Sequence, residues 1–95
     1  VMETFTEFAT EAVFGLLWSR PGLDRKTRAI VTVTSDVCNQ CWPELEIHLR
    51  FALNLGWTEE ELTETLLHLG GYIGVPVIRE AMLIADRVFA EGERI

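Results

Sequence analysis

The stretch PELEIHLRFALNLGWTEEEL, residues 43 to 62, carries the signals that end one helix and begin the next. Pro43 suits the first turn of a helix, and Gly56 stands where a helix C-terminus commonly needs a left-handed residue. Thr58 and Glu61 then match a capping box, in which each side chain accepts a hydrogen bond from the other residue's backbone N–H. The stretch therefore predicts two consecutive helices joined by a short turn, and an all-α fold.

Helical signals continue on the N-terminal side of this pair. Apolar residues recur every three or four positions from Met2 to Leu17, as on one face of an amphipathic helix, and RPG at 20 to 22 ends it. A further helix begins at Asp24, whose carboxylate suits the cap. IVTVT at 30 to 34 also fits a strand, because β-branched residues favour one, but we favour the helix.

The C-terminal side predicts two helices separated by a break. GGYIGVP, residues 70 to 76, breaks the fourth helix near Gly70, and a fifth helix follows Pro76. Its apolar face from Val77 to Phe89 is too broad for one small core to cover, which predicts a homo-oligomer, a trimer or a hexamer. Residues 1–95 thus predict a single-domain bundle of about five helices.

Composition excludes several classes of partner. The 95 residues include 8 Lys and Arg against 15 Asp and Glu, a net charge of −7, whereas a nucleic-acid-binding surface needs clustered cations. The longest mostly apolar stretch, residues 66 to 78, is too short to cross a membrane. The acidic N-terminus does not match a signal peptide. We therefore expect a cytoplasmic protein that binds neither nucleic acid nor membrane.

Two cysteines, Cys38 and Cys41, precede the third helix. With His48 and His68 they would give a C-x2-C-x6-H-x19-H order, which matches no usual zinc-site spacing, so we expect no metal. A redox dithiol needs an activated thiolate, and Cys41 stands just ahead of a helix start, where the helix dipole favours negative charge. The alternative, which we favour, is that both cysteines are small buried apolar residues.

His48 is a candidate for catalysis because of its position on the third helix. It shares a face with the apolar residues Leu45, Leu49, Ala52 and Leu55, so the spacing predicts that it points inward. An inward histidine can be an ordinary core residue bonded to a carbonyl, or an acid–base catalyst that titrates near neutral pH. The pattern alone leaves both possibilities open.

Three segments together resemble the 4-carboxymuconolactone decarboxylase family: LLWSRPGLDRKTRAIVTVT (16–34), ELEIHLRFALNLGWTEEEL (44–62) and GGYIGVPVIREAM (70–82). They contain W-x-R-P-G-L-D, E-L-x-x-H-x-x-x-A-L-N-x-G-x-T-x-x-E and Y-x-G-x-P in the family's order. The resemblance runs from Phe5 to Ala90 and implies an alkyl hydroperoxidase D-like helical fold, often hexameric, with a cofactor-free site near subunit contacts. It also implies a further segment ahead of the first helix.

The sequence departs from alkyl hydroperoxidase D, a relative with the C-x-x-C-x-x-x-H motif. Leu45 stands at that protein's histidine position, and His48 follows three residues later. Lys26 stands where the relative's upstream glutamate would fall. A thiol-disulfide peroxidase or reductase using Cys38 and Cys41 is therefore the alternative function.

The resemblance implies a cofactor-independent decarboxylase of a carboxylated lactone, similar to 4-carboxymuconolactone, in aromatic-compound degradation. The lactone carbonyl would serve as the electron sink, so no metal or organic cofactor is expected. His48 matches the family histidine and would donate the proton. Glu44, one turn earlier, would orient it.

The remaining candidates would bind a small carboxylate or lactone substrate. Arg28 and Arg20 are expected to hold carboxylates by bidentate hydrogen bonds. Trp18 of the W-x-R-P-G-L-D motif and Tyr72 at the helix break are further substrate-binding candidates. His68, near the end of the fourth helix, is expected to cap its carbonyls.

Overall fold

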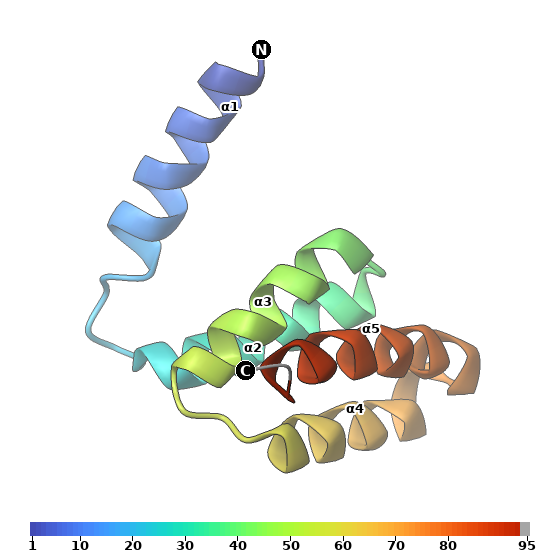
Figure 1. The fold of residues 1–95 in the computed structure, drawn as a ribbon. Helices are drawn as coiled ribbons and strands as arrows, with labels where there is room; N and C mark the ends of the chain where they lie inside the picture. The colour runs from blue at the N-terminus through green and yellow to red at the C-terminus, as the bar shows by residue number, and fades with distance from the viewer. Residues whose placement is uncertain (94–95) are drawn as a thin grey trace.

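The structure, a computed structural model, describes residues 1–93 (Figure 1). Its elements are α1 (Met2–Phe8), the π-helix η1 (Ala9–Leu17), α2 (Arg25–Cys38), α3 (Trp42–Asn54), α4 (Glu59–Ile73) and α5 (Val75–Glu93). No strand occurs in the part of the chain that the structure describes, so IVTVT is helical and the all-α prediction is confirmed. None of the described helices is long and apolar enough to span a membrane.

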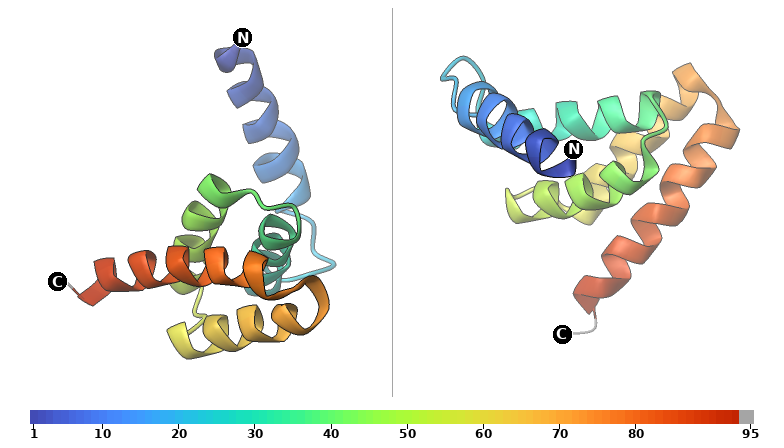
Figure 2. Two further views of the ribbon diagram at one scale, coloured as in Figure 1. Left: turned by 90° about the vertical axis from the view of Figure 1, so that its right-hand side faces the viewer. Right: turned by 90° about the horizontal axis from the view of Figure 1, so that it is seen from above.

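Helices α2 to α5 pack around one apolar core. α3 lies on one side of the bundle and α4 on the other, while α2 and α5 contact both (Figures 1 and 2). The core collects the inward faces of all four helices: Ala29, Val33, Val37, Leu45, Leu49, Ala52, Leu62, Leu66, Ile78, Ala81, Ile84, Ala85 and Val88. The predicted apolar stripe of α3 therefore lies in the core. The prediction that the apolar face of α5 is too broad for one core is wrong, because most of that face is buried within the single chain or packs against its core.

Helix α1 and η1 project from this bundle as one continuous arm (Figures 1 and 2). Neither element contains a buried residue, although the predicted apolar stripe is present. Phe5 and Phe8 are 58% and 66% exposed. A single chain thus leaves this stripe without a packing partner.

The predicted helix ends are confirmed where local chemistry determines them. Asp24 caps α2, and its carboxylate accepts a hydrogen bond from the Thr27 N–H at 2.7 Å. Gly56 has a φ of +108° in the turn after α3. The capping box of α4 is complete, because Thr58 and Glu61 exchange side-chain to backbone hydrogen bonds of 3.0 Å.

The predicted break near Gly70 is wrong. α4 continues to Ile73, and the chain turns at Gly74, where φ is +105°. Gly70 serves packing instead, since a Cβ at that position would lie 3.2 Å from Cγ1 of Ile78 on α5. The close approach of α4 and α5 therefore requires a small residue there, and tertiary packing outweighs the low helix propensity of glycine.

Replacing Thr58 with alanine is expected to lower the free energy of unfolding by about 1 kcal/mol, because the Glu61 N–H at the start of α4 loses its acceptor. Thr63→Ala is a matched control, since its hydroxyl donates only to the Glu59 carbonyl within the same helix. Urea denaturation measures both variants. Equal stability losses in the two would contradict the capping role.

The stability that the Glu61 side chain contributes through the capping box depends on pH. The hydrogen bond from the Thr58 N–H holds the pKa of the Glu61 carboxyl below its ordinary value. The ionised carboxylate therefore stabilises α4 above the ordinary pKa, and this stabilisation is lost as the pH falls through the lowered pKa of the folded state.

Candidate active site

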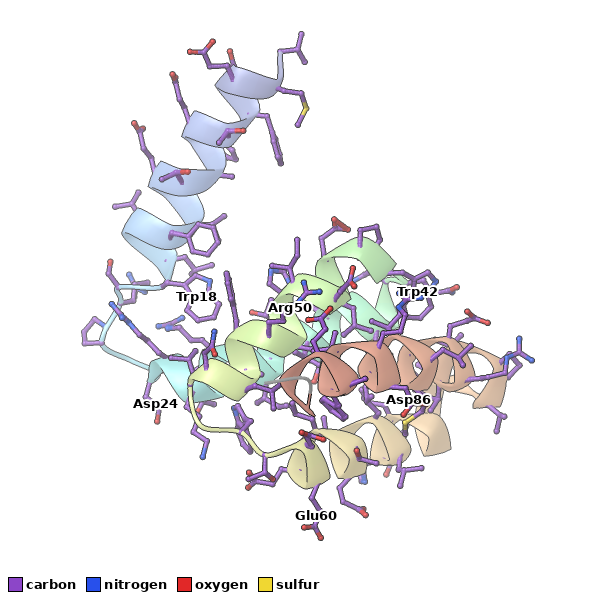
Figure 3. The ribbon with its side chains drawn as sticks, in the orientation of Figure 1. Trp18, Asp24, Trp42, Arg50, Glu60 and Asp86 are labelled. Carbon is purple, nitrogen blue, oxygen red and sulfur yellow. The ribbon has the colours of Figure 1, made fainter. Side chains whose placement is uncertain are left out.

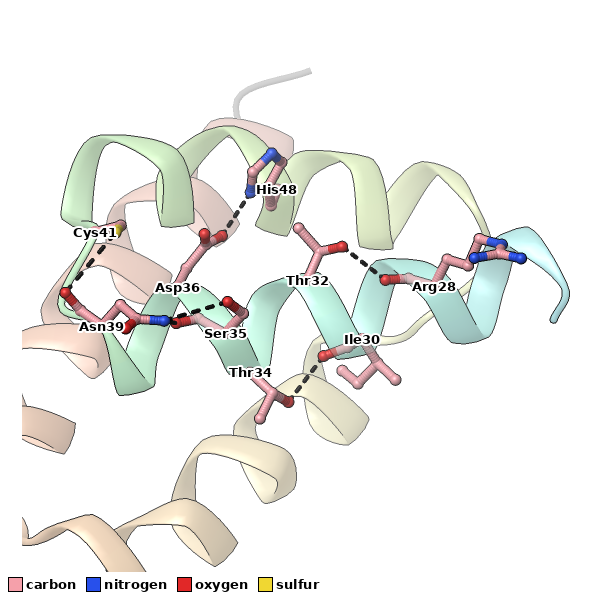
Figure 4. A network of polar contacts seen from close by, with 9 residues as sticks. All are labelled: Arg28, Ile30, Thr32, Thr34, Ser35, Asp36, Asn39, Cys41 and His48. Atoms are coloured by element: carbon pink, nitrogen blue, oxygen red, sulfur yellow. Dashed lines mark hydrogen bonds and ion pairs between the residues drawn. The ribbon is translucent and has the colours of Figure 1, made fainter. Parts of the chain in front are cut away.

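A histidine–aspartate pair joins α2 to α3 (Figure 4). Nδ1 of His48, in the middle of α3, lies 2.5 Å from Oδ2 of Asp36, in the last turn of α2. The His48 side chain is 21% exposed, so it is half-buried where the sequence predicted an inward position. One edge of the imidazole faces the protein and the ring remains accessible.

The packing of α2 against α3 fixes this pair. Leu45 and Leu49 on α3 and Val33 and Val37 on α2 are all fully buried and hold the two helices in register. Asp36 stands three residues after Val33, so it shares the inward face of α2. The packing of the two helices thus fixes the separation of the two side chains.

Asp36 is the one charged residue among the described side chains that is buried, with 7% exposure. Burial raises the pKa of its carboxyl above the ordinary value, while the hydrogen bond with His48 opposes this increase. The negative charge of Glu44 adds to the increase. The hydrogen bond with His48 therefore favours the ionised form of this carboxyl, against the effect of burial.

A row of polar side chains extends from this pair along α2. Arg28, Thr32 and Asp36 are spaced four residues apart, and Figure 4 shows Thr32 and Asp36 pointing toward α3. Arg28 and Thr32 line a small cavity of about 110 Å³, whose wall includes Trp18. The polar row thus runs from the base of the projecting arm to His48.

A larger cavity of about 380 Å³ lies between the arm and the C-terminal half of α3; it is lined by Phe14, Trp18, Arg25, Phe51, Asn54 and Leu55. Figure 3 shows Trp18 at the base of the arm. Phe51 connects the cavity to the histidine, because its ring centroid is 5.8 Å from that of His48. Arg25 gives this mainly aromatic and aliphatic cavity one cation.

Neither of the two arginines predicted to bind substrate lines the larger cavity. Arg28 donates from Nε to the Leu23 carbonyl and from Nη2 to the Arg20 carbonyl, both at 3.0 Å, so it holds the loop before α2. Arg20 is exposed in that loop and lines neither cavity. The structure instead brings Arg25 to the larger cavity.

Glu44, the predicted partner of His48, does not make the hydrogen bond with the imidazole. Glu44 is exposed in the first turn of α3, and Asp36 occupies the orienting position expected for it. Tyr72 is 80% exposed on α4, and its ring packs against His68 with centroids 5.3 Å apart. A single chain therefore does not bring Tyr72 to His48, and the ring of His68 packs on Tyr72.

The favoured prediction of two buried cysteines is wrong. Cys38, the last residue of α2, is exposed, and Cys41, at the N-terminus of α3, is half-buried; both are free. Gln40 between them has a φ of +54°, so the chain reverses direction at the surface before α3 re-enters the core. In the described part of the chain, no three His, Cys, Asp or Glu side chains gather as metal ligands would.

Sequence reasoning missed Asp36. A signal was present, because an acid follows Val33 by three residues on a face that otherwise carries Ala29 and Val37. A charged residue on an apolar stripe is unusual and calls for a partner.

A family model described as the carboxymuconolactone decarboxylase family matches residues 2–87. Nitrosuccinic acid decarboxylase of Metarhizium robertsii is 42% identical over 81 residues, covering 85% of this chain and 57% of the relative. 4-Carboxymuconolactone decarboxylase of Acinetobacter baylyi is 39% identical over 89 residues, covering 94% of this chain and 66% of the relative.

A third relative is an uncharacterised 15.0 kDa protein of Paracoccus denitrificans, which is 35% identical over 85 residues, or 87% of this chain and 63% of the relative. The chain spans less than two thirds of the length of each of these three relatives.

Proposed function

Since the chain belongs to the carboxymuconolactone decarboxylase family, we propose that it is a cofactor-independent carboxy-lyase acting on a carboxylated lactone or a related unsaturated acid. Two relatives of the chain are named as decarboxylases, and their names give different substrates. The substrate of this chain must therefore be inferred from its own site. We propose that this reaction is a step in the degradation of aromatic compounds.

Such a reaction places specific demands on the protein. The bond between the carboxylate and the substrate carbon breaks, carbon dioxide leaves, and the electron pair moves into the conjugated lactone carbonyl. One carbon of the resulting enolate then takes up a proton, and the electron pair returns from the oxygen to form the new C–H bond. The protein must supply an apolar wall beside the departing carboxylate, a cation for any carboxylate that remains, and an acid for the carbon.

The position of Phe51 carries this proposal. Its ring lies beside His48 and also lines the cavity of about 380 Å³, so the His48 imidazole is one aromatic ring away from an apolar cavity that has a cation at its wall. We assign the body of the substrate to the space between Trp18 and Phe51. Arg25 binds the retained carboxylate, and His48 donates the proton to carbon.

Release of carbon dioxide tests the function directly. The purified protein, treated with a chelator, is incubated with a panel of carboxyl-¹³C-labelled unsaturated lactones and β-keto acids, and ¹³CO₂ is measured. We expect release from at least one carboxylated lactone above the spontaneous rate. No release from the whole panel would contradict the proposal.

The exposed thiol of Cys38 and the position of Cys41 at the start of α3 favour one second candidate, a thiol-disulfide peroxidase or reductase. The same preparation, given a hydroperoxide and a dithiol reductant, tests it. Peroxide consumption that depends on both cysteines, without ¹³CO₂ release, would select this function over decarboxylation.

The double variant Cys38→Ser and Cys41→Ser is expected to retain decarboxylation within a few-fold. Neither cysteine lines the two cavities beside Trp18, and among the described residues the sulfur of Cys41 makes one long hydrogen bond, of 3.8 Å, to the Asn39 carbonyl. Steady-state kinetics check this. Loss of turnover, together with a disulfide that forms reversibly under mild oxidation, would assign the thiols to the reaction.

Arg25→Gln is expected to raise KM by about tenfold with little change in kcat, because a cation that binds the retained carboxylate acts equally in ground and transition states. Arg20→Gln is the matched control, since this exposed side chain lines neither cavity. An equal effect of the two changes would remove Arg25 from substrate binding and indicate a general effect of surface charge.

A further inference from the structure

We propose that Asp36 is the positioning residue of this site: it holds the Nδ1–H of His48 and thereby makes Nε2 the atom that delivers the proton. This inference rests on the proposed function for its role in turnover. Its structural content, the choice of ring nitrogen, can be tested without a substrate.

The geometry of the pair gives the first support. The Asp36 carboxylate has His48 as its only hydrogen-bonded side chain in the described part of the chain, at 2.5 Å. When Asp36 is ionised its carboxylate can only accept, so Nδ1 of the imidazole then carries the hydrogen of this contact. The other ring nitrogen lies on the side of the imidazole away from Asp36 (Figure 4).

The burial of Asp36 gives the second line of support for this role. It lies between Val33 and Val37 on α2. An apolar residue at this buried position would pack without the free-energy cost of dehydrating a charged group. A buried ion pair adds little net stability over apolar residues of similar size. The needs of the fold therefore do not explain an acid at this position, whereas control of a histidine does.

The consequence for the reaction follows from the proton count. With Asp36 ionised, the imidazolium form of His48 carries hydrogens on both nitrogens. After carbon dioxide has left, Nε2 gives its proton to a carbon of the substrate enolate, and the neutral ring keeps Nδ1–H bonded to Asp36. Nε2 then takes a proton from water before the next turnover.

Glu44 supplies a matched control for Asp36. It lies nearby, and its charge acts on the Asp36 carboxyl, but it is exposed and makes no hydrogen bond with His48. Removing its charge alters the local field without removing the bond to Nδ1. A difference between variants at the two positions therefore reports the hydrogen bond.

Nuclear magnetic resonance of protein labelled with ¹⁵N-histidine tests the inference. The chain has two histidines, so His68 serves as an internal reference beside His48. At a pH where both rings are neutral, we expect His48 to be the Nδ1–H tautomer in the unmodified protein and in Glu44→Gln, and to shift toward Nε2–H in Asp36→Asn. An Nε2–H tautomer in the unmodified protein, or no change in Asp36→Asn, would overturn the proposal.

A kinetic arm separates positioning from folding. On a substrate that the screen identifies, Asp36→Asn is expected to lower kcat at least about tenfold with KM unchanged. Asp36→Leu, which fills the same buried place, is expected to remain at least as resistant to urea and to lose as much activity. Because the tautomer measurement needs no substrate, failure of the proposed reaction would leave its result intact. Full activity in the folded leucine variant would overturn the positioning role.

Discussion

His48→Ala is expected to lower kcat by about 10²- to 10⁴-fold, the usual scale for removing an acid–base group from a reaction. The imidazole is the titratable group beside the cavity that Phe51 lines, and its second nitrogen faces away from the Asp36 carboxylate. The cavity itself should remain, since His48 is not part of its wall. KM should therefore change much less than kcat, and steady-state kinetics separate the two.

Folding must be checked because the alanine variant leaves Asp36 buried without its partner. His48→Gln is a second variant whose side-chain amide can still donate to the carboxylate but cannot transfer a proton at neutral pH. His68→Ala removes an exposed imidazole and serves as the control. If both His48 variants are folded by circular dichroism and retain the unmodified kcat, His48 has no part in the chemistry.

Phe5→Glu combined with Phe8→Glu is expected to convert a homo-oligomer, which we propose is a trimer or a hexamer, into smaller species. The arm formed by α1 and η1 buries none of its own residues against the bundle, and an isolated helix of this length is marginal in water. Packing against neighbouring copies would supply the missing apolar contacts, and two carboxylates on the stripe oppose it.

Light scattering coupled to size exclusion at micromolar concentration measures the assembly. Phe5→Leu with Phe8→Leu is the matched control, because it keeps an apolar surface and should keep the oligomer. An unmodified chain that runs as a monomer would contradict the proposed assembly. An oligomer that survives both glutamates would place the interface elsewhere, with the exposed apolar residues Val75 and Leu83 of α5 as the next candidates.

Features that depend on a few neighbouring residues were predictable from the sequence. The cap at Asp24, the left-handed Gly56 and the capping box at Thr58 each use contacts within one turn of chain, and the structure contains all three. The break near Gly70 was mispredicted for the converse reason. Whether a glycine ends a helix or admits a neighbour depends on what packs against it, here Ile78.

The candidate site was less predictable because its contacts cross between helices. His48 was found from its spacing, but Asp36 lies twelve residues earlier on another helix, and Glu44 on the same helix looked the nearer partner. The choice between Arg25 and Arg28 depends on the path of the loop before α2, which Arg28 itself holds. The path of this loop cannot be predicted from the local sequence pattern.

The central claim is that His48 protonates the substrate carbon inside the site, and the product formed in deuterium oxide tests it most directly. A group fixed on α3 by the Asp36 hydrogen bond can approach the carbon from one side only. The unmodified protein is therefore predicted to give product with one deuterium, all on a single face, at the carbon of the enolate that is protonated. Deuterium distributed equally over both faces would show that bulk water protonates the carbon, and would contradict the role assigned to His48.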